Sequence, residues 1–377
     1  MIVPVKEGGF LLPKKHISLE KWATIACDQH TSDKEYWDGL TQFVGDSPST
    51  LNLVFPEYYL ERVNKDKQID TIASAMKSYL DQNIFDEYFG MIKVERKLSN
   101  GKTRKGLLLL IDLEHYSFYT TEKPLIMASE NTVLGRLPIR EQLRVKSSLE
   151  TAHVLALYED KEFTVQSAVQ SAGATPLYDF DLNFDGGNIK GSLIKDCKGI
   201  ISAFGALIKQ SVSKYNQGVL FLVGDGNHSL ASAKNIYKQL KANGSDTTNC
   251  RYAMVEAVNI YDEALDFEPI HRLAFTDGNQ EQFLKDLYKD MPDCPIETVR
   301  YTDDFIDKRG FSADYVHGTE HLNKLAKELN AAAVHLKKMN KDDLFEYIIS
   351  KGVLPKKTFS LGEAQDKRYY LEVKKIT

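Results

Sequence analysis

Residues 218–244 read GVLFLVGDGNHSLASAKNIYKQLKANG, and the fold is predicted outward from this segment. The apolar run at 219–223 is short and β-prone, which predicts a buried strand. A helix is expected after it, because Leu230, Ala233, Ile236, Tyr237 and Leu240 recur at helical spacing. Asn227 or Ser229 is expected to cap the start of that helix, and Gly244 stands where its end is expected. Polar side chains therefore gather where a strand ends and a helix begins.

The corner between this strand and this helix suits an anion. Free N–H groups of a first helical turn, together with the helix dipole, favour phosphate or carboxylate. Gly224 and Gly226 allow close approach of the backbone, and Asn227 is a candidate phosphate-binding residue beside them. Asp225 and His228 are candidates for a base, an acid or a magnesium-facing carboxylate. The alternative is structural: the aspartate and asparagine shape the turn, and the histidine is a satisfied surface residue.

Residues 128–144 read ASENTVLGRLPIREQLR, and they include a glutamate and two arginines that are candidates for one binding site. Glu130, Arg136 and Arg140 are spaced so that two guanidinium groups face one ligand, and a guanidinium matches phosphate or carboxylate oxygens bidentately. Pro138 prevents a regular helix across the whole segment. The alternative is a set of surface ion pairs.

Two other polar clusters are candidates. His271 and Arg272 follow a proline that predicts a turn, and such a pair is suited to hold a phosphate or a carboxylate. The alternative there is a hydrogen-bonded structural histidine. Near the N-terminus, Cys27, Asp28 and His30 invite a catalytic interpretation, but a cysteine at a strand end is more often buried packing.

The composition excludes several classes of protein. The 377 residues carry a formal net charge of -5, with 27% charged and 42% hydrophobic residues, as in an ordinary globular protein. The lack of basic excess argues against a nucleic-acid partner. Four scattered cysteines form no CxxC pair and no zinc spacing, so a reduced cytoplasmic setting is expected. We expect no secretory leader and no membrane partner, since no apolar run approaches the ~20 residues that cross a bilayer.

Strands interleave with helices along the chain, which predicts an α+β (mixed α/β) fold with a mixed sheet and flanking helices. Asn100-Gly101, between apolar runs at 91–97 and 107–113, predicts a β-hairpin. The length suggests about two domains. We expect a main α/β domain at residues 1–275, which carries the candidate site, and a C-terminal α/β portion at 276–377, which packs on it.

Several longer motifs in the same order resemble the domain of unknown function 1015 family (DUF1015). They run from near residue 22 to near residue 373, so the resemblance covers almost the whole chain. The motifs are ACDQHTSDKEYW, ASENTVLGRLPIR, LYDFDLNFDGGNIKG, VGDGNHSLASAK, VEAVNIYDEALDFEPIHRL and GVLPKKTFSLGEAQDKRYYLE.

The family's usual central motif, aspartate-glycine-histidine-histidine-arginine before a helix, is similar to one in the group of ParB, sulfiredoxin and free serine kinase. In that group the loop and the helix start bind the phosphate of a nucleotide or a substrate, and the resemblance implies a ParB-like core within a larger fold. Here Asn227 replaces the first histidine and Ser229 replaces the arginine. Phosphate binding would then fall to the backbone, His228 and the arginines Arg136, Arg140 or Arg272.

Longer members of the family tend to be encoded beside serine-biosynthesis enzymes, which implies a step between phosphoserine and serine. The resemblance therefore implies a phosphate-handling enzyme that acts on a small phosphorylated metabolite. It would be either a serine kinase-like phosphotransferase that uses ADP or ATP, or a phosphoserine phosphatase.

Under this resemblance the candidate residues, including His271 and Arg272, converge on one cleft. Asp225 or Glu130 would orient the hydroxyl or water, with Mg²⁺ as a candidate cofactor. His228 would carry a proton or donate a hydrogen bond to phosphate. Two other classes stay open: a ParB-like regulator that binds nucleic acid or nucleotide, and a non-catalytic small-molecule sensor.

Overall fold

The computed structural model describes residues 2–31, 33–119, 122–151 and 153–376. The chain divides into two compact units: residues 1–264 with 363–377, and residues 265–362. This division differs from the predicted boundary at residue 275. The C-terminal residues return to the first unit because their strands pair with strands of that unit.

A large mixed sheet forms the centre of the first unit, and thirteen strands of the described residues belong to it. These strands are β1 (Val5–Lys6), β2 (Gly8–Pro13), β4 (Phe85–Lys97), β5 (Thr103–Asp112), β6 (Tyr116–Ser117), β7 (Ile126–Ala128), β8 (Leu149–Thr151), β9 (Leu155–Tyr158), β10 (Thr175–Asp181), β11 (Asn188–Ile194), β12 (Phe221–Asp225), β13 (Tyr252–Asn259) and β19 (Val373–Lys375). Their hydrogen-bonded order is β6-β7-β12-β9-β13-β5-β4-β2-β19-β8, with β1 beside β5 and with β11 between β4 and β10. A separate antiparallel pair joins β3 (Thr24–Ile25) to β18 (Tyr369–Tyr370).

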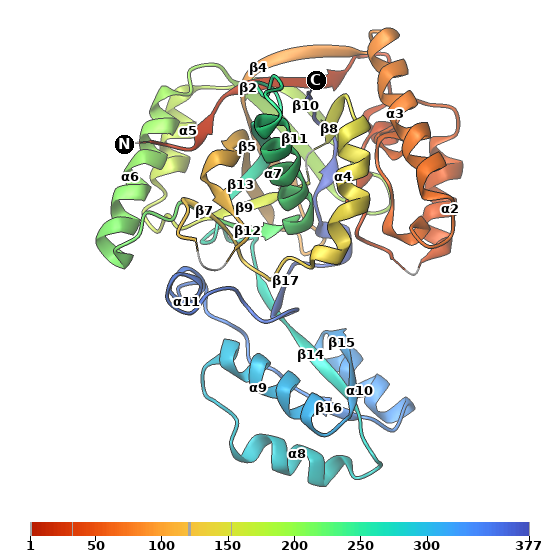
Figure 1. The fold of residues 1–377 in the computed structure, drawn as a ribbon, viewed down its shortest axis with the longest axis vertical. Coiled ribbons are helices and arrows are strands. Elements are labelled where there is room, and N and C mark those ends of the chain that lie inside the picture. Colours follow the sequence, from red (N-terminus) through yellow and green to blue (C-terminus); the bar gives the residue numbers. More distant parts are fainter. Residues whose placement is uncertain (1, 32, 120–121, 152, 377) are drawn as a thin grey trace. The chain divides into compact units, whose positions relative to one another are not determined.

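Helices cover both faces of this sheet (Figure 1). They are α1 (Leu19–Trp22), α2 (Lys34–Val44), α3 (Lys65–Asp81), α4 (Leu137–Lys146), α5 (Thr164–Ala172), α6 (Lys198–Tyr215) and α7 (Asn227–Ala242). Short 3-10 helices lie in the connections at η1 (Thr50–Leu53), η2 (Glu57–Tyr59), η3 (Leu113–His115), η4 (Leu134–Arg136) and η5 (Ala364–Asp366). Helix α4 packs against α7.

The sheet separates two hydrophobic cores, because alternate residues of a strand point to opposite faces. On β5, Leu107, Leu109 and Ile111 pack into one core, whereas Leu108 and Leu110 pack into the other. Helices α5, α6 and α7 contribute to the first core, and α1, α2 and α3 contribute to the second. In Figure 1, α5 and α6 accordingly lie on the opposite side of the strands from α2 and α3.

The second unit is built on β14 (Phe267–Phe275), which pairs antiparallel with β15 (Ser312–His317), β16 (Ala332–Val334) and β17 (Phe359–Leu361). Its helices are α8 (Gln280–Lys289), α9 (Pro295–Lys308), α10 (Thr319–Glu328) and α11 (Asp343–Lys351). Phe283, Leu287 and Val299 from the helices pack on Ala274 of the central strand, so this unit has its own core.

The predicted mixed fold, with a mixed sheet and flanking helices, is confirmed. The predicted hairpin is also confirmed, since β4 and β5 pair across it with Ile92 opposite Leu108. The turn predicted at His271 and Arg272 is wrong: both residues lie inside β14, which accommodates the preceding proline near its start. No helix in the described ranges is both long and apolar enough to span a membrane.

Two glycines test the packing of the first unit in opposite directions. A Cβ on Gly191 would lie 2.1 Å from the ring of the buried Tyr178, so Gly191→Ala should lower the free energy of unfolding by about 1–3 kcal/mol. Gly199 is exposed in α6, and a Cβ there meets nothing within 4 Å. Gly199→Ala should therefore raise the unfolding free energy by about 0.5–1 kcal/mol. Urea denaturation of both variants checks the pair, and equal effects would contradict this packing.

Candidate functional site

The register of three neighbouring strands brings the candidate acidic residues to one edge of the sheet. β12 runs parallel to β7 with Val223 opposite Ala128, and Asp225 and Glu130 follow two residues further along each chain. β9 runs antiparallel to β12 on its other side, with Leu155 opposite Asp225. His153, two residues before Leu155, therefore enters the same edge from the opposite direction.

Gly226 makes the turn from β12 into α7. Its φ is 83°, in the left-handed region, and a Cβ there would lie 2.9 Å from Val154 Cγ2, so a side chain is excluded on both counts. Gly226 is the N-cap of α7, without a side-chain capping bond. The prediction that Asn227 or Ser229 caps the helix is therefore wrong, and the first turn of α7 keeps N–H groups for a ligand.

Asp225 is held as a partly buried anion. Its carboxylate lies 3.3 Å from Lys367 Nζ and accepts the N–H of Gly226 at 2.9 Å. Burial raises the pKa of Asp225, but the charge of Lys367 and the hydrogen bonds from Lys367 and Gly226 outweigh it, so the pKa is lowered. Lys367 reaches this point because the segment before β18 continues the pairing with β3, where the N–H of Ala26 donates to the carbonyl of Arg368 at 3.0 Å.

A second carboxylate, Asp28, lies near the first. Burial, followed by the negative charge of Asp225, raises the pKa of Asp28, while His153 and Lys367 act in the opposite direction. The pKa values of the two carboxyl groups are therefore shifted in opposite directions, that of Asp28 upward and that of Asp225 downward. Environments that separate two carboxylates in this way provide an acid and a base in one site.

His153 connects the carboxylates to α7. Its Nε2 is 3.2 Å from Ser229 Oγ, and its ring lies 5.1 Å from that of Tyr370. The side chain is only 9% exposed, and Nδ1 has no hydrogen-bond partner among the described residues. Burial lowers the pKa of His153 more than Asp28 and Asp225 raise it, so the imidazole is neutral at pH 7.

His228, in the first turn of α7, is half-buried and also neutral at pH 7. Its Nε2 accepts the N–H of Val133 at 3.2 Å, which leaves the hydrogen on Nδ1. Burial, followed by the charges of Arg140 and Arg136, lowers the pKa of His228 to about 4. Both arginines therefore place positive potential at the start of α7.

The two arginines are not equally available to a ligand. Arg136 is exposed, whereas Arg140 pairs with Glu57 and donates to the carbonyl of Arg136 at 2.9 Å. One turn further along α4, Arg144 pairs with Glu150, and its Nε is buried without a partner in the part of the chain that the structure describes. Arg140 therefore forms an ion pair, as the alternative interpretation predicted. Its guanidinium group has more N–H donors than these two contacts use, so it can also bind a ligand.

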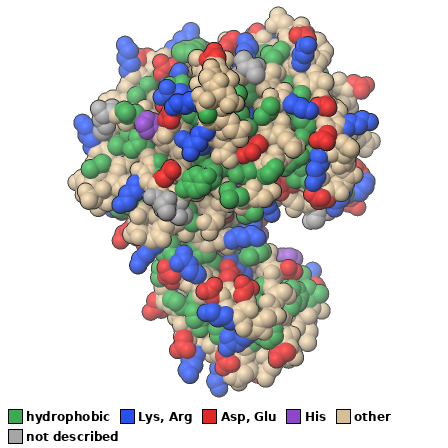
Figure 2. All heavy atoms as spheres, in the orientation of Figure 1, with side chains coloured by type: hydrophobic (Ala, Val, Ile, Leu, Met, Phe, Trp, Pro, Cys, Tyr) green, Lys and Arg blue, Asp and Glu red, His purple; other side chains and the backbone are tan. Residues whose placement is uncertain are grey.

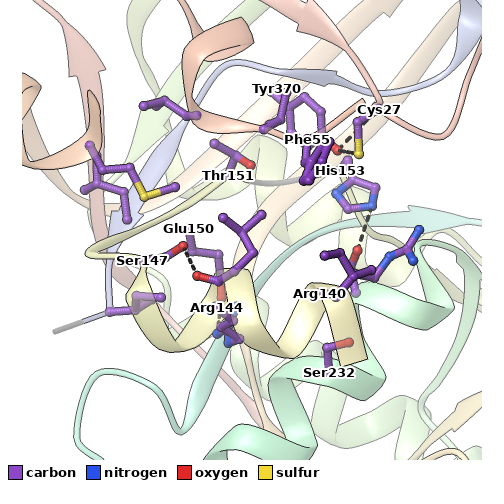
Figure 3. Close-up of a pocket in the computed structure, with 18 of the residues that line it drawn as sticks. Cys27, Phe55, Arg140, Arg144, Ser147, Glu150, Thr151, His153, Ser232 and Tyr370 are labelled. Atoms are coloured by element: carbon purple, nitrogen blue, oxygen red, sulfur yellow. Dashed lines mark hydrogen bonds and ion pairs between the residues drawn. The ribbon is translucent and has the colours of Figure 1, made fainter. Parts of the chain in front are cut away.

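A cavity of about 130 Å³ opens beside this corner. Figure 3 shows Arg140 and His153 at one end of it and Arg144 with Glu150 at the other. Its apolar wall includes Leu53, Phe55, Leu60, Met76, Leu143 and Leu149, and its polar side includes Cys27, His153, Ser229 and Tyr370. Burial raises the pKa of Cys27 to about 12, so this thiol is protonated and unreactive.

The structure thus gathers most of the predicted site residues around the corner. Eight of them belong to this group: Glu130, Arg136, Arg140, Gly224, Asp225, Gly226, Asn227 and His228. Of these, Arg140 alone is among the described residues that line the cavity.

His271 and Arg272 belong to the second unit and are engaged within it. The guanidinium of Arg272 is fully buried, pairs with Asp303 at 2.6 Å and donates to three carbonyl groups. His271 Nδ1 accepts the N–H of Leu336 at 3.1 Å. Both residues are thus held by structural contacts within the second unit, and we do not include them in the proposed phosphate site.

Sequence reasoning did not assign Asp28, His153, Ser229, Lys367 or Tyr370 to the site. The motif containing Cys27 and Asp28 was a usable signal, since a polar cluster follows an apolar run there. His153 and Lys367 carry no local signal, because only strand pairing brings them to Asp225.

No group of three or more His, Cys, Asp or Glu side chains suited to a metal ion occurs in the part of the chain that the structure describes. The ionised Asp225 already binds an ammonium group. Mg²⁺ usually needs only one or two carboxylates together with substrate phosphates. The described residues therefore form no preformed binding site for Mg²⁺.

With this geometry described, the chain can be assigned to a family. It belongs to the family described as "Protein of unknown function (DUF1015)", whose model matches residues 11–375. A search of curated proteins gave no match.

Three solved structures show weak likenesses. A mutant free serine kinase in complex with AMP is 10% identical, with a TM-score of 0.39, and the match covers 71% of this chain and 92% of that one. A mutant free serine kinase in complex with ADP is 10% identical, with a TM-score of 0.38 and coverages of 73% and 93%. A conserved hypothetical protein from Pyrococcus furiosus is 11% identical, with a TM-score of 0.30 and coverages of 70% and 90%. Likenesses at these TM-scores carry no argument about this chain.

The low pKa of His228 predicts a pH-dependent stability. Its folded pKa of about 4 lies below the ordinary histidine pKa of 6.5, so the unfolded chain binds the proton more tightly. The stability from the neutral imidazole is present above pH 6.5 and is lost as pH falls towards 4, on the order of 1 kcal/mol after allowance for solvent screening. Denaturant titrations from pH 4 to pH 8 should show a smaller slope in His228→Gln than in the exposed control His16→Gln. Equal slopes would contradict this environment.

Proposed function

We propose that this protein is a phosphate-handling enzyme that acts on a small phosphorylated metabolite, with phosphoserine and serine as the first substrate pair to test. One observation carries the proposal: the N-terminus of α7, without a side-chain cap, lies beside the partly buried ion pair of Asp225 and Lys367. Backbone N–H groups, a helix dipole and an ammonium group then act on the same anion.

Binding of the phosphoryl group is assigned to the corner. The N–H groups of Asn227 and His228 point along the helix axis towards it, and Gly226 lets the ligand approach the backbone. The Nδ1–H of His228 is a further donor. Arg136 and Arg140 contribute positive charge, which phosphoryl transfer requires at its transition state.

Proton transfer is assigned to the acidic edge. Asp225, ionised, and Glu130, which follows the neighbouring strand, orient the attacking hydroxyl or water. His228 is less suited to the predicted role of proton carrier, because its pKa of about 4 keeps it neutral near pH 7.

The choice of phosphoserine rests on the serine-biosynthesis enzymes that are encoded beside longer members of the family. The resemblance of the motif at 224–230 to phosphate-binding loops supports only the binding of a phosphate group. The acceptor is either water or a nucleoside diphosphate, so a phosphatase and an ADP- or ATP-dependent phosphotransferase are both included. We also propose a cytoplasmic location, which the free thiols of all four cysteines support.

Turnover by the purified full chain tests the proposal. Phosphoserine is supplied with and without ADP and with and without Mg²⁺, and serine is supplied with ATP for the reverse direction. Phosphorus NMR and a serine assay then follow the products. Release of phosphate, or formation of ATP, supports the phosphatase or the phosphotransferase respectively. No turnover in any arm by folded protein would overturn the enzyme proposal.

The two other classes give different results. A non-catalytic sensor would bind phosphoserine in calorimetry without turnover. A ParB-like regulator would shift DNA in a gel and lose the shift with added salt. The face of the molecule in Figure 2 shows Lys and Arg side chains interspersed with Asp and Glu, and the net charge is -5, so neither observation favours nucleic acid.

A further inference from the structure

Ser229 stands where the family's usual motif has an arginine, and the structure gives this serine a specific neighbour. Its Oγ is 3.2 Å from His153 Nε2, and both side chains line the cavity. Ser229 lies in the first turn of α7, a helix of 16 residues, so its hydroxyl is close to the positive end of the helix dipole. A hydroxyl, an imidazole and an anion-stabilising helix start thus meet at one cavity.

We propose that Ser229 is a nucleophile and His153 its general base, so that group transfer at this corner passes through a phosphate ester of Ser229. The proposal deepens the phosphate-handling function and rests on it for the natural substrate. It does not rest on that function for the reactivity of the serine itself.

The surroundings of His153 support this role. The side chain is more than nine-tenths buried, and its Nδ1 has no partner among the described residues, which a purely structural histidine would normally acquire. With the hydrogen on Nδ1, Nε2 is free to accept the hydroxyl proton. The nearby carboxyl groups of Asp28 and Asp225 favour the imidazolium that then forms, whereas Arg140 and Arg368 oppose it.

The proposed step balances as follows. Ser229 Oγ attacks the phosphorus of a phosphate monoester, a new O–P bond forms, and the bond from phosphorus to the substrate oxygen breaks. The hydroxyl proton passes to His153 Nε2 and from there to the departing alcohol oxygen. In the second step, water or the protonated terminal phosphate of a nucleoside diphosphate attacks the same phosphorus, and the bond from phosphorus to Ser229 Oγ breaks. The acceptor's proton passes through His153 Nε2 to Ser229 Oγ, which restores the hydroxyl and releases inorganic phosphate or a nucleoside triphosphate.

A reagent that needs no natural substrate tests the reactivity directly. An alkyl fluorophosphonate transfers its phosphonyl group to an activated serine with loss of fluoride. We expect the full-length protein to gain one phosphonyl group, located at Ser229 by fragmentation of the peptide, and Ser229→Ala to gain none. His153→Asn should label at least ~100-fold more slowly, as expected for loss of a general base. Ser171→Ala removes an exposed helical serine in α5 and should label at the unchanged rate.

The absence of labelling in native protein, or labelling at Ser232 in place of Ser229, would overturn the inference. Circular dichroism of each variant excludes misfolding as the cause of a lost label. Acid quenching during phosphoserine turnover should trap the phosphate ester on Ser229. If turnover occurs while label and trapped ester are both absent, Ser229 is not the nucleophile, but the proposed function is retained. If Ser229 is labelled but phosphoserine is not consumed, the nucleophile stands and the proposed substrate fails.

Discussion

Asp225→Asn should lower kcat/KM for phosphoserine turnover by about 10²–10⁴-fold, the range typical for loss of a positioned acid–base group. The substitution keeps the shape of the side chain but removes its charge. Lys367 then loses its charged partner at 3.3 Å, and His153 loses one of the two carboxylates that favour its protonated state. Steady-state kinetics of the variant and of the wild-type protein give the comparison.

The matched control is Asp179→Asn, which removes the carboxylate of another lysine pair in the same unit. Asp179 lies 2.8 Å from Lys190, but both side chains are more than half exposed. Exposed pairs contribute little, so this variant should keep wild-type kinetics. An Asp225→Asn variant that folds and keeps activity within a factor of about three would remove Asp225 from the chemistry.

Arg368→Met should lower the free energy of unfolding by about 3–5 kcal/mol, because it leaves buried carboxylates without their cation. Arg368 is 1% exposed, and its guanidinium lies 2.7 Å from Glu256 and pairs also with Glu372. Both glutamates are fully buried. Arg104 approaches Glu256 only at 3.4 Å, so it does not replace the lost partner.

Denaturant unfolding at neutral pH measures this effect. Lys190→Met serves as the control, because it breaks an exposed pair and should change the unfolding free energy by less than about 1 kcal/mol. Arg368 is next to Lys367 in sequence, so its pairing also fixes the segment that supplies the ammonium group to Asp225. Equal losses in the two variants would contradict the structural role of the buried network.

Much of the fold could be predicted from local patterns. The apolar run at 219–223 and the helical spacing from Leu230 to Leu240 predicted β12 and α7, because each pattern reports a periodicity that the backbone imposes. Asn100-Gly101 predicted the β4–β5 hairpin for the same kind of reason. The helix cap was mispredicted because Gly226, with positive φ, takes the position that Asn227 or Ser229 was expected to occupy.

The composition of the site could be predicted only in part. Asp225 and His228 lie on the motif itself, and Glu130 follows a strand that pairs in parallel with it. His153 comes from an antiparallel neighbour, and Lys367 comes from a strand pair that joins the two ends of the sequence. No local pattern specifies such pairings. Arg272 is the opposite case. The His-Arg pair in the sequence is suited to a phosphate, but in the structure Asp303, thirty-one residues later in α9, binds the guanidinium group.

The central claim is that the start of α7 binds a phosphate group. Amide proton–nitrogen correlation spectra of the full chain, recorded during titration with inorganic phosphate, test it most directly. The largest shifts should fall on the N–H groups of Asn227, His228 and Ser229, and they should be much weaker in a protein carrying Lys367→Met. If those three amides stay unchanged while the largest shifts fall in residues 265–362, the claim is contradicted.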